Sequence, residues 1–228
     1  MKRRIDKWLS KWRNKDDRDV RLVRGARQVG KTYSIRERGK SFDNYLEVNF
    51  EEHREVHSFL EGNLTPSPIC EKLSAYHGIP IVSGKTLLFF DEIQACPNAL
   101  SSLRFFREQR PDLHVVASGS LLEFAIEELP SQGVGRISSL FMYPMSFAEF
   151  LEALNEGPLL AIMKEASPVN PIAAPFHRKL IDLFRTFQLI GGMPRVVQAY
   201  VSRHDLNECM ELLDSLLVML RDDFAKYK

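Results

Sequence analysis

Residues 25–32 read Gly-Ala-Arg-Gln-Val-Gly-Lys-Thr, so two glycines with four residues between them precede a lysine and a threonine. Glycine lets the backbone approach phosphate groups closely, and the N–H groups at a helix start attract anions. Lys31 would supply a mobile positive charge for β- and γ-phosphates, and Thr32 a hydroxyl for Mg²⁺. The expected ligand contacts of this phosphate loop are Gly25, Ala26, Arg27, Gln28, Val29, Gly30, Lys31, Thr32 and the adjacent Tyr33.

Two acidic residues end the apolar run Thr-Leu-Leu-Phe-Phe-Asp-Glu at 86–92. The run predicts a buried parallel strand, and open parallel sheets bind their ligands at the carboxyl ends of strands. We expect Asp91 to hold Mg²⁺ there through water, and Glu92 to orient and polarise an attacking water molecule. The alternative is that the two acids merely end a strand.

Two serines follow the next predicted strand, at Ser118 and Ser120. If this strand is the neighbour of the one that carries Asp91, a serine hydroxyl there could contact the γ-phosphate or the attacking water. Ser120 could instead cap the helix that follows. Both interpretations stay open, and one serine could serve each.

Strand and helix patterns alternate through the first part of the chain, which indicates a parallel α/β sheet with flanking helices. The predicted strands are 20–24, 45–50, 86–92, 113–120 and 137–143. The predicted helices between them are 30–38, 51–62, 65–78, 97–110 and 121–129. The first strand runs into the phosphate loop and the first of these helices leaves it, which is the arrangement that the motif needs.

Beyond Pro144 the patterns are helical only. Four helical stretches follow, with the proline-rich linker 167–175 between the first two. We therefore expect an α/β core at 1–144 and a small all-helical subdomain at 145–228.

The composition is that of a globular protein, with 44% hydrophobic and 27% charged residues and a net charge of +1. Residues 1–27 nevertheless hold eleven Lys/Arg against four Asp. A solvated helix with arginines near a phosphate site is the favoured explanation. Nucleic-acid binding stays open but is unsupported by the net charge. The chain has three cysteines that lie far apart in the sequence, and it has neither an apolar leader nor an apolar run long enough to span a membrane. We therefore expect a cytoplasmic protein without a membrane partner.

Together, the segments GARQVGKT, FFDEIQACPNALSSLRFFRE, ASGSLLEFA, VGRISSLFMYPMSFAEFL and GGMP resemble the AAA+ ATP-binding proteins of bacteria and archaea. The likeness extends from Lys2 to about Asp222. It implies a P-loop NTPase sheet with the phosphate-loop strand central, a helical lid subdomain, and ATP with Mg²⁺ as ligands. Members usually carry a further C-terminal domain of uncertain function, whereas this chain ends at Lys228 inside a helical pattern. A truncated and a naturally short form both stay open.

The resemblance also assigns roles to residues outside the phosphate loop and the acidic pair. Ser118 or Ser120 would be the polar sensor. Arg136 stands just before the last predicted strand, where AAA+ proteins place an arginine finger, so self-association through that face is possible. Pro194 would contact the adenine base, and Arg195 would reach the phosphates.

These expectations describe an Mg²⁺-dependent ATPase that binds ATP and ADP and couples its nucleotide state to movement of the lid or of a protein partner not identified by the sequence. One alternative is a nucleotide-binding switch or scaffold that does not hydrolyse ATP, although Glu92 speaks against it. A second alternative is a small-molecule kinase with the same loop. Such kinases usually have an arginine-rich lid, and the arginines here are inconclusive.

Overall fold

The computed structural model describes residues 1–15, 18–120, 122 and 137–225, with side chains as far as Asp222. The chain forms two compact units. The sheet unit consists of Ile5–Ala26 and Gly30–Met142. The helical unit consists of Met1–Arg4, Arg27–Val29 and the chain from Tyr143 onward. The helical unit therefore also takes in the N-terminal residues and the tip of the phosphate loop, which the sequence did not predict.

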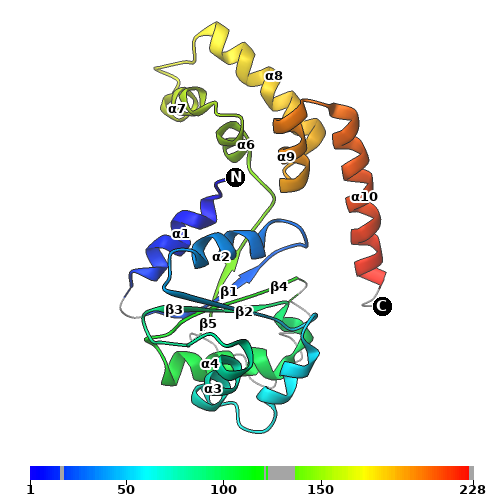
Figure 1. Ribbon diagram of the computed structural model, residues 1–228. Helices are drawn as coiled ribbons and strands as arrows, with labels where there is room; N and C mark the ends of the chain where they lie inside the picture. Colours follow the sequence, from blue (N-terminus) through cyan, green and yellow to red (C-terminus); the bar gives the residue numbers. More distant parts are fainter. Residues whose placement is uncertain (16–17, 121, 123–136, 226–228) are drawn as a thin grey trace. The chain divides into compact units, whose positions relative to one another are not determined.

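The sheet unit is built on five parallel strands in the order β2-β3-β4-β1-β5 (Figure 1). These strands are β1 (Val20–Arg24), β2 (Asn44–Asn49), β3 (Thr86–Asp91), β4 (His114–Gly119) and β5 (Ile137–Phe141). The parallel P-loop NTPase-like sheet that we expected is thus confirmed. In one detail it differs: β4 is central, and the phosphate-loop strand β1 is an interior strand between β4 and β5.

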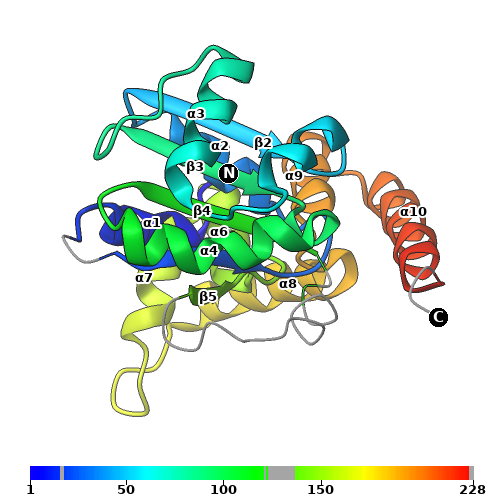
Figure 2. The same ribbon diagram turned by 90° about the horizontal axis from the view of Figure 1, so that it is seen from below.

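Helices cover both faces of this sheet, which explains why every residue of β3 and β4 is buried. They are α1 (Arg4–Arg13), α2 (Lys31–Gly39), α3 (Pro66–His77) and α4 (Pro97–Gln109), with the short 3₁₀ helices η1 (Arg54–Leu60) and η2 (Ile93–Ala95). Figure 1 shows α1 and α2 on one face and α3 and α4 on the other, and Figure 2 looks onto the second face.

One predicted helix of the sheet unit forms a shorter element, and another falls almost entirely outside the described residues. The helix expected over 51–62 is the shorter 3₁₀ helix η1, with bonds over three residues such as Glu61 N–H to the Ser58 carbonyl at 3.4 Å. The helix expected over 121–129 lies outside the described residues, apart from Leu122.

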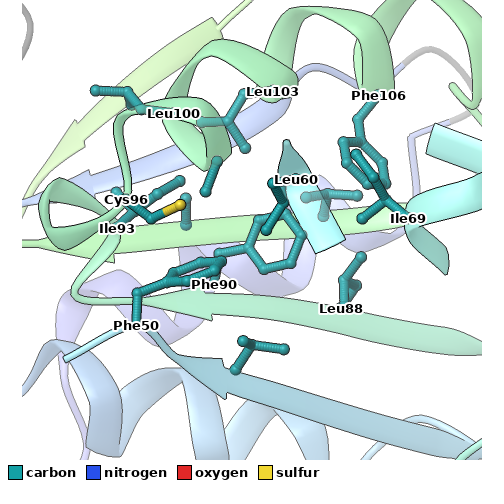
Figure 3. Packing of buried hydrophobic residues seen from close by; sticks show 14 of the residues in the cluster. Phe50, Leu60, Ile69, Leu88, Phe90, Ile93, Cys96, Leu100, Leu103 and Phe106 are labelled. Carbon is teal, nitrogen blue, oxygen red and sulfur yellow. The ribbon is translucent and has the colours of Figure 1, made fainter. Parts of the chain in front are cut away.

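The main core of the sheet unit lies between the sheet and the helices α3 and α4 (Figure 3). Leu88 and Phe90 point into it because alternate residues of β3 face the same side of the sheet. The ring of Phe90 packs against Phe50 and Phe106, with centroids 5.5 and 5.7 Å apart. Burial of these large side chains is the main force that fixes β3, and so the position of the acids at its end.

The basic N-terminal helix α1 is amphipathic rather than solvated on all sides. Ile5, Leu9 and Trp12 are buried, whereas Lys7 and Lys11 are exposed. The indole of Trp12 donates to the Asp19 carbonyl at 2.9 Å. The indole of Trp12 is therefore used for packing, while the ring of the half-buried Trp8 lies 4.4 Å from the guanidinium carbon of Arg21.

The helical unit contains α6 (Phe147–Ala153), α7 (Gly157–Glu165), α8 (Ala174–Ile190), α9 (Pro194–Arg203) and α10 (Leu206–Ala225). We expected four helices after Pro144; α7 is an additional one. The fully buried ring of Phe150 packs against Phe187 and Tyr200, at centroid distances of 5.4 and 6.0 Å. Among the helices described, none has both the length and the apolar character to cross a membrane.

Candidate functional site

The phosphate loop joins the carboxyl end of β1 to the first residue of α2. Gly25 and Gly30 have backbone φ angles of 149° and 97°, values that residues with a Cβ atom rarely adopt. Gln28 also has a positive φ, 62°, although it is not a glycine. Gly30 is the N-cap of α2, so the free N–H groups of the first helical turn lie at the loop. The local backbone is thus that of an anion-binding turn.

The side chain of Lys31 turns back onto this loop. Its ammonium donates to the carbonyl oxygens of Gly25 at 2.8 Å and Ala26 at 3.0 Å, and the residue is 5% exposed. A buried positive charge is therefore held beside the backbone N–H groups. Both features favour a negatively charged ligand at this position.

Asp91 brings three elements together at the same edge of the sheet. It is the last residue of β3, and its carboxylate accepts from the Thr32 hydroxyl of α2 at 2.8 Å. It also accepts from the Ser118 hydroxyl of the adjacent strand β4. Asp91 is 3% exposed. Burial raises the pKa of Asp91, while the hydrogen bonds from Ser118 and Thr32 oppose that rise.

Glu92 follows in a left-handed conformation, with φ 46° and ψ 48°. Its carboxylate accepts from the Ser120 hydroxyl at 3.4 Å and from the Gln94 side-chain amide at 2.7 Å. The Gln94 side chain can lie against the backbone of β4 because residue 119 is a glycine. A Cβ atom there would lie 2.2 Å from the Gln94 Oε1. The two serines whose roles the sequence left open therefore contact different acids.

Gln94 is a contact that the sequence did not predict. The only signal was Gly119, which reveals the close approach once β4 and η2 are known to be neighbours. Of the other predicted residues, Tyr33 is 53% exposed, and Pro194 and Arg195 begin α9 in the helical unit. Arg136 lies outside the described residues. The roles of all these residues stay predictions.

The residues around Asp91 have the chemistry that Mg²⁺ prefers, because Thr32, Asp91 and Ser118 all offer oxygen atoms. Over the described ranges, no three His, Cys, Asp or Glu side chains are grouped so that they could hold a metal alone. A site with one carboxylate and hydroxyls suits a cation that arrives with phosphate oxygens, since Mg²⁺ commonly shares its ligands with a substrate phosphate.

Comparison with known proteins extends this description. A family model described as "AAA domain" matches residues 17–151, which is more than half of the chain. No match was found among curated proteins.

Among solved structures, the Walker-type ATPase PABY2304 of Pyrococcus abyssi resembles 98% of this chain over 75% of its own length, with 15% identity and a TM-score of 0.57. PCH-2 of C. elegans resembles 88% of this chain over 61% of its own, with 14% identity and a TM-score of 0.43. The ORC1 protein of Aeropyrum pernix, solved in complex with DNA, resembles 82% of this chain over 65% of its own, with 14% identity and a TM-score of 0.43. At 15% identity, the likeness to PABY2304 concerns the fold alone.

Proposed function

We propose that this chain, which belongs to the AAA domain family of P-loop NTPases, binds ATP with Mg²⁺ and hydrolyses it to ADP and inorganic phosphate. The observation that carries the proposal is the contact of the phosphate-loop hydroxyl of Thr32 with Asp91, 2.8 Å apart. This contact supports the proposal because a hydroxyl and a carboxylate are oxygen ligands that suit Mg²⁺, and the second acid, Glu92, comes directly after Asp91. A loop that served only as a turn would need neither acid.

The residues of the loop would bind the triphosphate. Lys31 would exchange the carbonyl oxygens of Gly25 and Ala26 for β- and γ-phosphate oxygens, and the N–H groups around Gly30 would donate to the same phosphates. Thr32 and Asp91 would hold Mg²⁺, which would neutralise charge on the phosphate oxygens. Pro194 and Arg195 would contact adenine and phosphates from the helical unit.

Glu92 would act on the attacking water. Its carboxylate would accept a hydrogen bond from that water and receive its proton as the oxygen attacks the γ-phosphorus. The bond between the γ-phosphorus and the bridging oxygen breaks, so ADP leaves with that oxygen. Ser120 and Gln94 would fix the orientation of the Glu92 carboxylate, and Ser118 that of Asp91.

We place the hydrolytic core at residues 1–144 and the lid at 145–228. The loop tip Arg27–Val29 packs with the helical unit, and this supports coupling between nucleotide state and the lid. Arg136 would complete the site, from a neighbouring subunit or from its own chain.

The test is phosphate release from ATP, with Mg²⁺ and with excess chelator, by wild type and Lys31→Ala. Hydrogen bonds to charged groups contribute about 1.5–3 kcal/mol, so Lys31→Ala should lower ATP affinity by roughly 10- to 100-fold or more in calorimetry. Lys11→Ala, which removes an exposed lysine of α1, is the matched control and should bind normally. Unchanged affinity in folded Lys31→Ala would remove the phosphate-loop assignment.

The same assay distinguishes the alternatives. ATP binding by wild type without phosphate release would indicate a switch or scaffold. Release that requires an added hydroxyl acceptor, which itself becomes phosphorylated, would indicate a kinase.

A further inference from the structure

A buried arginine near the N-terminus connects three distant segments of the helical unit. Arg3 is 8% exposed, and each of its three guanidinium nitrogens donates a hydrogen bond. Nη1 donates to the Val29 carbonyl of the phosphate loop at 2.6 Å, and Nη2 to the Tyr143 carbonyl at 2.7 Å. Nε donates to the Glu149 carboxylate at 3.0 Å. A planar guanidinium carries its donors on three separate nitrogen atoms, so one side chain can reach three acceptors that lie apart.

Glu149 is itself held firmly, so it can anchor the guanidinium. It is the third residue of α6 and forms a capping box with Ser146, accepting from the Ser146 N–H at 2.9 Å. It also accepts from the Arg4 N–H at 2.8 Å. Burial opposes ionisation, but these N–H donors and Arg3 lower the pKa of Glu149 below its usual value. The carboxylate therefore stays charged at neutral pH, as the buried pair requires.

The contact with Val29 bears on the phosphate loop through the geometry of one peptide. The Val29 carbonyl and the Gly30 N–H belong to the same planar trans unit, so they point in opposite directions. Fixing the carbonyl toward Arg3 fixes the Gly30 N–H away from it. Gly30 has no Cβ and has a φ of 97°, so this peptide would otherwise rotate easily.

We infer that Arg3 is a positioning residue for phosphate binding, which holds the Val29–Gly30 peptide so that the Gly30 N–H faces the nucleotide phosphates. Through Glu149 and Tyr143 it also joins this peptide to the start of α6, so the loop tip and the helices move together. The inference rests on the proposed function, because it requires that the loop bind nucleotide. It adds a residue outside the loop motif to the residues that determine nucleotide affinity.

A purely structural ion pair would stabilise the fold without changing the affinity of the folded protein. The experiment therefore measures ADP affinity by calorimetry, below the melting temperature of each variant, for wild type, Arg3→Ala and Arg3→Lys. Arg4→Ala is the matched control, because it removes an adjacent exposed arginine and keeps the N–H that binds Glu149.

We expect Arg3→Ala to weaken ADP binding by roughly 10- to 100-fold, in line with loss of charge-assisted hydrogen bonds that hold a binding group. Arg3→Lys should restore only part of the affinity, since one ammonium cannot span the three acceptors. Arg4→Ala should bind as wild type. Millimolar ethylguanidinium, which can occupy the space left by the side chain, should raise the ADP affinity of Arg3→Ala and leave wild type unchanged.

A spectroscopic readout addresses the peptide itself. In protein labelled with ¹⁵N-glycine, the Gly30 amide signal should shift on addition of ADP in wild type and shift much less in Arg3→Ala. If Arg3→Ala does not fold, Arg3→Lys and Glu149→Gln decide by the same two measurements. If a folded Arg3 variant binds ADP with wild-type affinity and shows the normal Gly30 shift, this inference is wrong, while the proposed function stands. Absence of ADP binding by wild type would overturn the proposed function, and the inference with it.

Discussion

Asp91 is the residue that joins the motifs of the site, because its carboxylate accepts from Thr32 of the phosphate loop and from Ser118 of the adjacent strand. The phosphate loop and the acids that end an apolar run are local patterns, because phosphate geometry and strand burial dictate their spacing. Ser118 and Ser120 were left open because their roles depend on which strand lies beside β3. The structure places Ser118 on Asp91 and Ser120 on Glu92.

Arg3 and Gln94 could not have been found in this way. Arg3 meets Val29 and Glu149 only after the chain folds, and a basic segment at a chain start has no signal that distinguishes a buried arginine from solvated ones. The contact of Gln94 with Glu92 likewise depends on the packing of η2 beside β4.

At the residue scale, the geometry around Asp91 predicts a metal-specific defect. Asp91→Asn removes the carboxylate that contacts Thr32 and would hold Mg²⁺. The gain in ATP affinity on adding Mg²⁺ should therefore shrink, while the ATP affinity in chelator should change little. Calorimetry with and without Mg²⁺ measures both. Asp43→Asn, at an exposed position before β2, is the control. An equal Mg²⁺ effect in wild type and Asp91→Asn would show that Asp91 is not a metal ligand.

At the scale of elements, the strands were predictable because apolar runs in a covered parallel sheet stand out from their surroundings. The helix α7 was missed because only a few residues separate it from α6. Asn155, with a φ of 60°, turns the chain between them, and asparagine tolerates this left-handed conformation without an obvious sequence signal. The 3₁₀ form of η1 was missed because hydrophobic patterning does not distinguish it from an α-helix.

The helical unit depends on a close backbone approach at Gly192. Its carbonyl accepts from the Met145 N–H at 2.6 Å, and a Cβ at residue 192 would lie 2.2 Å from the Met145 carbonyl oxygen. Gly192→Ala must therefore separate two backbones, and we expect a loss of about 1–3 kcal/mol or more in the free energy of unfolding.

Urea denaturation followed by circular dichroism measures this change. The control is Gly157→Ala at the start of α7, where an added Cβ has nothing within 4 Å. Alanine is a better helix former than glycine, so Gly157→Ala should be neutral or stabilising by up to about 1 kcal/mol. Similar stabilities for the Gly192→Ala variant and wild type would contradict the packing described for Met145.

At the scale of the whole molecule, assembly is the open expectation. Arg136 lies outside the described residues. Three roles are open for it: contact with the nucleotide of a neighbouring subunit, contact with the nucleotide of its own chain, or a structural ion pair. A guanidinium that reaches the γ-phosphate can raise turnover by roughly 1,000- to 100,000-fold. If it acts between subunits, a mixture of inactive Arg136→Ala and Glu92→Gln should regain some ATPase activity, because some interfaces then hold both intact residues.

Phosphate release from the mixture, with association checked by light scattering, measures this recovery. Each variant alone at the same total concentration is the control. No recovery from proteins shown to associate would exclude action between subunits, and full activity of Arg136→Ala alone would exclude both catalytic roles.

The central claim is that the acids at the end of β3 make the phosphate loop hydrolytic, and Glu92→Gln tests it most directly. The amide keeps the size of the side chain but cannot take a proton from water. The measurement is single-turnover hydrolysis of ATP with Mg²⁺, alongside ATP affinity. We predict unchanged or tighter ATP binding and hydrolysis slower by about 100- to 10,000-fold, the usual contribution of a general base. Hydrolysis at the wild-type rate would show that Glu92 only ends a strand.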